Sequence, residues 1–257
     1  MNLGLNGKRF VVGGASKGLG RAIATCLVEE GARVLLVSRD GEALAAVAAD
    51  LGENAASCPA DVADPAAPAT ILAGIEATFG GRLDGLVVNA GGPPGGKALD
   101  LSDEQWLASY QVLLGGPLRL LRALVPRMDD GAAILFVTST SVRQPIPNLD
   151  TSNVLRPGVT ALAKTLAREL APRIRVNSLA PGRFDTDRVR SLDEQRAAAL
   201  GTTPEEQKEQ SAKAIPFGRY GEPAEFGRVG AFLLSPAASY VSALAAHADG
   251  AAVAALP

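Results

Sequence analysis

Residues 8–39 read KRFVVGGASKGLGRAIATCLVEEGARVLLVSR, and this stretch decides the fold. An apolar run at residues 10–12 enters a glycine-rich turn at residues 13–20, and a helical segment then leads to a second apolar run at residues 34–37. Strand, glycine turn, helix and strand within about 30 residues are typical of a βαβ unit that holds a nucleotide. Glycine lets the backbone approach a phosphate closely, and the first N–H groups of the helix attract the anion. A tight turn without a ligand is the alternative that this stretch alone leaves open.

Apolar runs and helical patterns alternate along the rest of the chain. Further strands are expected at residues 57–60, 86–88, 133–138 and 174–179, and helices at 42–51, from Pro65 to 79, at 102–114, 117–128 and 152–170. This alternation, without a repeat of hairpin turns, predicts an α/β fold with one doubly wound parallel sheet flanked by helices. No linker-like tract divides the chain, so we expect a single nucleotide-binding domain over residues 1–257.

The composition excludes several functional classes. The formal net charge is −2 and the basic residues are scattered, so nucleic acid is not expected as a partner. Two cysteines, Cys26 and Cys58, and one histidine, His247, are too few for a metal centre of Cys and His ligands, so no metal is expected. No apolar stretch of 18 residues exists, and the first residues do not form a signal peptide. The sequence therefore predicts a cytoplasmic protein without a membrane partner.

Residues 187–216 differ from the rest because they are charged and weakly apolar. They are expected to form two helical pieces, broken at residues 201–204. The segment follows a predicted strand whose carboxyl end should face the ligand crevice. A solvated surface insertion is one interpretation; we favour a lid over a substrate pocket, since long segments above strand ends commonly cover ligands.

Several motifs together resemble the short-chain dehydrogenase/reductase family, and in particular its 3-oxoacyl-(acyl-carrier-protein) reductase-like members. The glycine turn has the family spacing Gly-x-x-x-Gly-x-Gly, with Gly13 in place of a threonine. The resemblance covers nearly the whole chain and implies a Rossmann-type fold. It implies cofactor contacts at Gly14, Ser16, Lys17, Gly18, Leu19, Gly20, Ser38, Arg39, Asp61, Val62, Asn89, Ala90, Gly91, Arg156, Pro181, Gly182 and Thr186. In relatives the positions of Asp61 and Val62 contact adenine, those of residues 89–91 lie beside a ribose, and those of Pro181, Gly182 and Thr186 cradle the nicotinamide amide.

The end of the second predicted strand indicates which cofactor is used. NAD-dependent relatives place an acidic residue there, whereas this chain has Ser38 followed by Arg39, with Lys17 in the glycine turn. Two cations without an opposing carboxylate suit the 2′-phosphate of NADP. Asp40 would weaken such a site if it turned inward. The sequence thus predicts NADP(H) rather than NAD(H).

The catalytic positions depart from the family pattern. Relatives carry Tyr-x-x-x-Lys thirteen residues after an active serine; counting from Ser139, those positions are Ser152 and Arg156. The family's asparagine is replaced by Leu113, within one residue of register. A serine hydroxyl is a far weaker acid than a tyrosine held beside a lysine, and arginine keeps its proton.

Two hypotheses follow from these replacements. In the first, the chain is an NADP-dependent oxidoreductase of a ketone or secondary alcohol, in which Ser139 orients the carbonyl. Ser152 or a water then supplies the proton, and Arg156 stabilises negative charge. In the second, the chain binds the nucleotide without catalysis and serves as a sensor or assembly partner. The polar stretch 138–148 favours the enzyme.

A homo-oligomer is also implied by the resemblance. Relatives commonly form tetramers through the helices that correspond to residues 102–128 and 152–170 and through the C-terminal segment. Residues 232–234 and the apolar tail 251–256 suit such a contact. We therefore expect a homotetramer or a homodimer.

Overall fold

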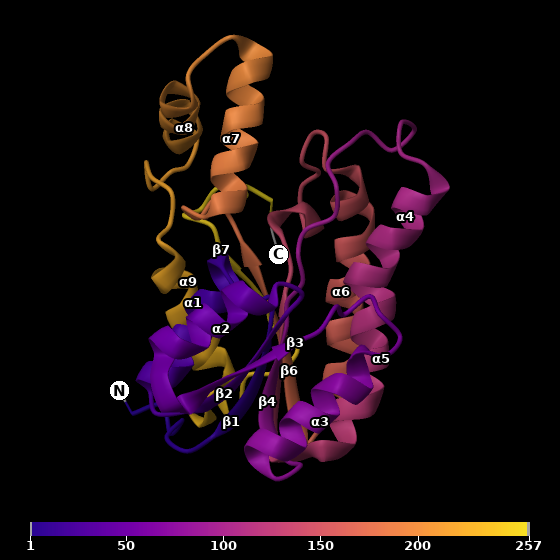
Figure 1. The fold of residues 1–257 in the computed structure, drawn as a ribbon. Helices are drawn as coiled ribbons and strands as arrows, with labels where there is room; N and C mark the ends of the chain where they lie inside the picture. The colour runs from indigo at the N-terminus through magenta and orange to yellow at the C-terminus, as the bar shows by residue number, and fades with distance from the viewer. Residues whose placement is uncertain (1, 256–257) are drawn as a thin grey trace.

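A computed structural model of the protein describes residues 2–255. Its centre is a seven-stranded sheet in the order β3-β2-β1-β4-β5-β6-β7, in which every neighbouring pair is parallel (Figure 1). The strands are β1 (Arg9–Gly13), β2 (Arg33–Ser38), β3 (Ala55–Pro59), β4 (Leu83–Val88), β5 (Met128–Val137), β6 (Ile174–Pro181) and β7 (Ala245–Ala248). The chain runs from β1 outward to β3 and then returns to β4 on the other side of β1. This reversal is the switch point at which doubly wound sheets bind ligands, and the predicted fold class is confirmed.

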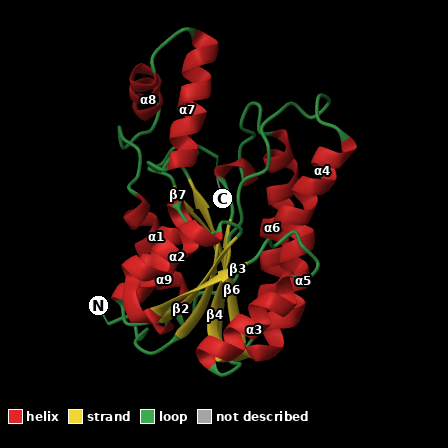
Figure 2. Ribbon diagram, in the orientation of Figure 1, coloured by secondary structure: helices red, strands yellow, loops and turns green. Residues whose placement is uncertain are grey.

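Helices cover both faces of the sheet (Figure 2). They are α1 (Gly18–Glu29), α2 (Gly41–Leu51), α3 (Ala67–Phe79), α4 (Asp103–Tyr110), α5 (Gly116–Leu124), α6 (Asp150–Glu169), α7 (Asp187–Leu200), α8 (Pro204–Lys213) and α9 (Pro223–Leu234). Helices α1, α2 and α9 lie on one face and α3 to α6 on the other, whereas α7 and α8 project beyond the carboxyl end of the sheet (Figure 1). The segment 187–216 therefore contains the two expected helices.

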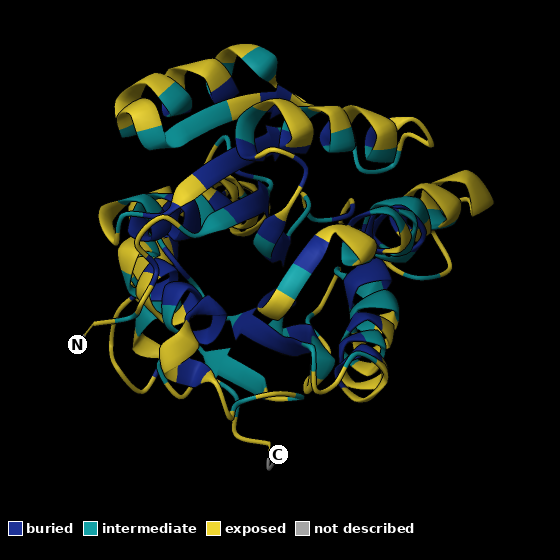
Figure 3. Ribbon diagram, turned by 90° about the horizontal axis from the view of Figure 1, so that it is seen from below, coloured by how far each residue is buried: buried dark blue, intermediate teal, exposed yellow. Residues whose placement is uncertain are grey.

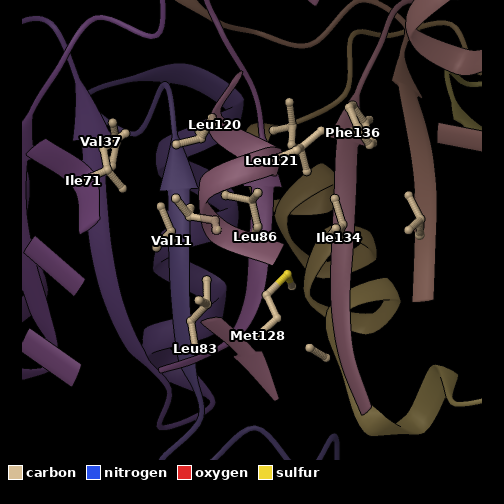
Figure 4. Close-up of a cluster of buried hydrophobic side chains, with 14 of the residues drawn as sticks. Val11, Val37, Ile71, Leu83, Leu86, Leu120, Leu121, Met128, Ile134 and Phe136 are labelled. Atoms are coloured by element: carbon tan, nitrogen blue, oxygen red, sulfur yellow. The ribbon is translucent and has the colours of Figure 1, made fainter. Parts of the chain in front are cut away.

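Two apolar cores lie on the two faces of the sheet. One joins α3, α5 and α6 to the strands through side chains such as Ile71, Leu86 and Phe136 (Figure 4). The other joins α1 and α9 to the opposite face through Ile23 and Phe226. Buried residues gather along the strands and the inner sides of the helices, and exposed residues line the outer sides (Figure 3). Each fully buried large apolar side chain contributes about 1.5–3 kcal/mol, so these cores hold the strand ends in place.

Proline positions explain where two predicted helices differ from the structure. The third helix begins at Ala67 with Pro68 in its first turn, whereas Pro65 lies in the preceding turn, so the expected start at Pro65 is wrong. Residues 103–124 form one continuous column in place of two separate helices, with a π-helical turn at Gln111–Gly115. Pro117 has no N–H and its ring would crowd the carbonyl of Leu113, and the wider turn lies where that conflict arises.

The short strand β7 has no counterpart in the expected elements. Its residues are Ala-Ala-His-Ala, which carry little strand propensity, and it forms by pairing with the end of β6. Of the predicted apolar tail, Leu256 lies outside the described residues. Within residues 2–255, no helix is both long enough and apolar enough to cross a bilayer.

A charged cluster ties together the amino-terminal ends of β1 and β4. The Asp84 carboxylate accepts hydrogen bonds from the Arg9 backbone N–H at 2.9 Å and Nε at 2.8 Å, and from Lys8 Nζ at 3.1 Å. Burial by itself raises the pKa of Asp84, but the hydrogen bonds from Arg9 and Lys8 outweigh it, so the net pKa is lowered. A lowered pKa stabilises the folded state at every pH above the unfolded value of about 4, and that stabilisation is lost as the pH falls through the folded pKa.

We expect Asp84→Asn to lower the free energy of unfolding by about 1–3 kcal/mol at pH 7, because the charged acceptor is lost. The difference from the native chain should shrink as the pH falls below about 4, where Asp84 of the unfolded chain becomes protonated, and it should be smallest once the pH is below the lowered pKa of Asp84 in the folded state. Urea unfolding at several pH values measures this. The control is Asp50→Asn, since Asp50 pairs with Arg21 on the open surface. A difference that is the same at pH 3 and pH 7 would contradict the assignment.

Candidate active site

The glycine turn after β1 packs so tightly that the backbone itself forms a cradle. A Cβ on Gly20 would lie 2.2 Å from the carbonyl oxygen of Gly14 and 2.8 Å from Asn89 Nδ2. Asn89 Nδ2 in turn donates to the carbonyl oxygen of Gly13 at 3.1 Å, which ties the end of β4 to the turn. The first N–H groups of α1 point out of this turn, and such groups bind phosphate. The cradle is suited to a dinucleotide phosphate.

A pocket of about 360 Å³ lies beside the ends of β2 and β3. It is lined by Arg39, Pro59, Ala60, Asp61, Asp64, Ala67 and Thr70. Its place at the carboxyl ends of β2 and β3 suits the adenosine end of a dinucleotide. Two residues predicted for that end, Arg39 and Asp61, therefore line one pocket.

The surroundings of Arg39 correct one expectation. A carboxylate does oppose this cation: Arg39 Nη1 lies 4.0 Å from Asp61 Oδ2. The Arg39 side chain is 74% exposed, and such open pairs contribute only about 0–1 kcal/mol, so the guanidinium remains available to a phosphate. Asp40 does not turn inward, because its carboxylate caps α2 by accepting from the Ala43 N–H at 3.0 Å. Lys17 is exposed at the start of α1, and Ser38 Oγ donates to the Asp40 carbonyl at 3.4 Å.

The remaining predicted cofactor residues follow β1, β3, β4 and β6 along the same edge. Ser16 and Leu19 lie in the glycine turn after β1, Val62 follows Asp61 after β3, and Ala90 and Gly91 follow Asn89 after β4. Pro181 ends β6 and Gly182 follows it. Thr186 caps α7 by accepting from the Val189 N–H at 3.4 Å, and its methyl group would lie 3.7 Å from a Cβ on Gly18. The structure thus gathers the predicted set along one edge of the sheet.

The three predicted catalytic residues lie at and beyond the end of β5. Ser139 follows the strand, and its Oγ accepts from the Ser141 N–H at 3.1 Å. Ser152 lies in the first turn of α6 and is 5% exposed. Its hydroxyl pairs with Ser141 Oγ at 3.0 Å, and no hydrogen bond joins Ser139 to Ser152 within residues 2–255. Ser141 was not predicted; the 3₁₀ turn Thr140–Val142 brings its hydroxyl to Ser152, and only the run of four hydroxyl residues at 138–141 hinted at it.

Arg156 lies one helical turn after Ser152. Its Nη1 donates to the carbonyl oxygens of Val137 at 3.1 Å and Thr138 at 2.8 Å, which fixes the guanidinium over the end of β5. Nε and Nη2 make no hydrogen bond within the described part of the chain, so these donors remain for a ligand. Burial, and to a lesser extent the charge of Arg188, lowers the pKa of Arg156 to about 10, so the group stays cationic at neutral pH.

Arg188, in the first turn of α7, is a second guanidinium that sequence reasoning missed. Its Nη2 donates to the Pro93 carbonyl at 3.3 Å and its Nη1 to the Gly92 carbonyl at 3.5 Å. Gly92 and Pro93 follow β4, the strand beside β5. Nothing in the sequence around Arg188 distinguishes it from the other charged residues of α7.

A buried polar cluster holds the base of α7. Asp193, 3% exposed, pairs with Arg183 and accepts from the Tyr220 hydroxyl at 2.9 Å. Arg183 Nε also donates to the Tyr220 hydroxyl at 2.9 Å. The hydroxyl of Tyr220 is therefore engaged away from Ser152.

We expect Asp193→Asn to increase the amide hydrogen-exchange rates of α7 and α8 while the central strands keep their protection. Loss of the buried charge leaves Arg183 with a weaker partner, and breaking such a pair costs about 3–5 kcal/mol at most. Hydrogen exchange followed by mass spectrometry measures this. Glu209→Gln, which removes an exposed pair with Lys213, is the control. Equal exchange in Asp193→Asn and native protein would show that the cluster does not hold the helices.

Comparisons with known proteins agree with this geometry. The sequence model described as enoyl-(acyl carrier protein) reductase matches residues 14–251. The 3-oxoacyl-(acyl-carrier-protein) reductase of Salmonella typhimurium is 33% identical over 252 residues, which cover 96% of this chain and 98% of that protein.

Solved structures are similar over almost the full length. L-sorbose reductase from Gluconobacter frateurii, complexed with NADPH and L-sorbose, has a TM-score of 0.94 at 30% identity over 100% of both chains. An NADPH-bound short chain oxidoreductase from Pseudomonas aeruginosa PAO1, described as containing an atypical catalytic center, has a TM-score of 0.87 at 30% identity and covers 97% of this chain and 98% of its own. The chain belongs to the short-chain dehydrogenase/reductase family.

Proposed function

We propose that the chain reduces a ketone, or oxidises the matching secondary alcohol, at a site with serine and arginine in place of the family's tyrosine and lysine. As a family member it is an oxidoreductase. The observation that carries the proposal is the Arg156 guanidinium, fixed by two carbonyl oxygens at the end of β5 with Nε and Nη2 left for a ligand. A preoriented cation beside a reacting oxygen is the largest single aid to such a reaction.

NADP(H) is the cofactor that this chain's residues fit. The cradle at Gly14 and Gly20 leaves no room for side chains, as a bound phosphate requires. Arg39 is an exposed cation that lines the adenosine pocket, Lys17 is an exposed cation in the glycine turn, and the acidic side chain of NAD-dependent relatives is Ser38 here. Relatives of known structure contain NADPH. When bound, the cofactor supplies the hydride.

The chain's own residues would complete the reduction. Arg156 Nε and Nη2 donate to the carbonyl oxygen and stabilise the negative charge that develops as the hydride joins the carbonyl carbon. Ser139 orients the carbonyl. The resulting alkoxide takes a proton from Ser152 or from a water, and Ser141, 3.0 Å from Ser152, can pass a proton on to it. Arg156 holds its own proton throughout.

We also propose a domain organisation, an oligomeric state and a location for the chain. Residues 1–257 act as one domain, and residues 187–216 act as a lid, because α7 and α8 project beyond the carboxyl end of the sheet (Figure 1). A homotetramer or homodimer and a cytoplasmic location also remain predictions. A monomeric mass in light scattering would contradict the assembly.

A second candidate, nucleotide binding without catalysis, has one observation in its favour. Ser152 is 5% exposed and already paired with Ser141, so it presents no strong acid to a substrate. Such a protein would act as a sensor or assembly partner.

One experiment separates the two candidates. The protein is titrated with NADPH and NADH, and a carbonyl panel that includes thioester 3-ketones is screened for NADPH oxidation. We expect tighter NADPH binding, and turnover above that of a Ser152→Ala, Arg156→Ala control. Binding without such turnover favours the second candidate, and tighter NADH binding overturns the cofactor assignment. If the double variant Ser152→Tyr, Arg156→Lys oxidises NADPH where the native chain does not, the scaffold is intact. The native residues at these two positions are then what separates this chain from its active relatives.

A further inference from the structure

Two guanidinium groups that have no carboxylate partner among residues 2–255 lie at the carboxyl ends of adjacent strands. Arg156 is bound to carbonyl oxygens at the end of β5, and Arg188 is bound to carbonyl oxygens after β4. The positive charge of Arg188 contributes to the lowered pKa of Arg156. Because β4 and β5 are neighbours in the sheet, both groups lie at the same edge, where a substrate carbonyl is expected.

Cations close to Arg188 in the sequence and in the fold have carboxylate partners. Arg190, two residues later, pairs with Asp185 and Asp187. Lys208 of α8 pairs with Asp185 as well. Arg188 has no ion pair within residues 2–255. Asp185 and Asp187 are thus close to Arg188 in the sequence, but they contact Arg190 and Lys208.

The approach of Arg188 to the loop after β4 depends on glycine. A Cβ on Gly92 would lie 2.3 Å from both Cζ and Nη2 of Arg188. Any other residue at position 92 would displace the guanidinium. Its two contacts, at 3.3 and 3.5 Å, are long for hydrogen bonds, so they can yield to an ionised acceptor.

From this arrangement we propose that Arg188 binds a carboxylate of the substrate, aided by the nearby positive charge of Arg156, so that the ketone reduced by this site is an oxo acid. The proposal rests on the proposed function, since it assigns the substrate class of the same site. A planar guanidinium binds a carboxylate through two parallel hydrogen bonds, and a second cation nearby adds to the attraction. The diphosphate of the cofactor is the other source of such an anion. The glycine cradle and the first turn of α1 already receive it, whereas Arg188 contacts the loop beyond Asn89, toward Arg156.

Binding to the NADP⁺-saturated protein tests this without turnover. Pyruvate, acetoacetate and 2-oxoglutarate are each titrated by calorimetry against their methyl esters. We expect at least one acid to bind about tenfold or more tightly than its ester. Arg188→Met should abolish that preference and leave the NADP⁺ affinity unchanged. Gly92→Ala displaces the Arg188 guanidinium but keeps its charge, and it should also reduce the preference for acid over ester.

Arg190→Ala is the matched control, since it removes an arginine of α7 that already has carboxylate partners. It should change neither affinity. The proposal is wrong if no acid binds more tightly than its ester. It is also wrong if Arg188→Met weakens NADP⁺ binding but keeps the preference for acid over ester, because Arg188 would then bind the cofactor. If an acid binds through Arg188 but no NADPH is oxidised, the carboxylate site is supported and the proposed reaction is refuted. Failure of the site and failure of the reaction are therefore distinguishable.

Discussion

Replacement of Gly20 by alanine is expected to raise the Kd for NADPH by about 100-fold or more, equivalent to about 2.7 kcal/mol. The added Cβ would lie 2.2 Å from the Gly14 carbonyl oxygen, a backbone atom that no rotamer change can move. Relief requires the turn to shift, and the turn is the phosphate cradle. Overpacking of this kind also lowers the free energy of unfolding by about 1–3 kcal/mol. Fluorescence titration with NADPH and urea unfolding measure the two effects.

Gly158→Ala is the matched control for the glycine turn. Its Cβ would lie 3.5 Å from Leu114 Cδ1, which is an ordinary contact, and Gly158 lies inside α6. Alanine is favoured over glycine in a helix by about 0.5–1 kcal/mol, so this variant should be slightly more stable and bind NADPH normally. If Gly20→Ala binds NADPH as well as Gly158→Ala does, the turn does not hold the cofactor phosphate.

Arg156→Met should lower kcat for ketone reduction by about 10²–10³-fold, the usual effect of removing a donor that stabilises a developing oxyanion. The Kd for NADPH should change by less than about tenfold, because the phosphate cradle is untouched. Arg156→Lys should recover part of the rate, since it restores the charge but not the fork of donors. Steady-state kinetics at saturating NADPH measure these values.

Arg168→Met is the control for this effect, because Arg168 is an exposed residue near the end of the same helix. It should leave kcat unchanged. Arg156→Met with native kcat would mean that the guanidinium does not contact the reacting oxygen, and the proposed role of Arg156 would have to be abandoned.

The sequence predicted the parts of the fold that depend on local pattern. The apolar runs of β1, β2 and β4 are buried on both sides, so they read as strands without reference to the rest of the chain. The gathering of the predicted cofactor residues along one edge was also predictable, because parallel strands end at one edge and the residues after them meet there. The short strand β7 was not, because its alanines form a strand only by pairing with β6.

The catalytic end of the site was only partly predictable. Counting residues placed Ser152 and Arg156 on the right helix, but a count cannot show which hydroxyl turns toward Ser152. That depends on the 3₁₀ turn after β5, which presents Ser141. Arg188 was missed because its position depends on the carbonyl groups of Gly92 and Pro93, nearly a hundred residues earlier in the chain. Contacts between distant loops leave no periodic trace in a sequence.

The central claim is that this serine and arginine site transfers a hydride. The most direct measurement incubates the protein with NADPH carrying deuterium at the transferred position and with a ketone that the panel identifies, and then analyses the alcohol by mass spectrometry. We predict an alcohol with one deuterium on its carbinol carbon, formed at least about 100-fold faster than by the Ser152→Ala, Arg156→Met variant. Bound NADPH with no deuterated alcohol above the level of that variant, for every ketone of the panel, would contradict the claim.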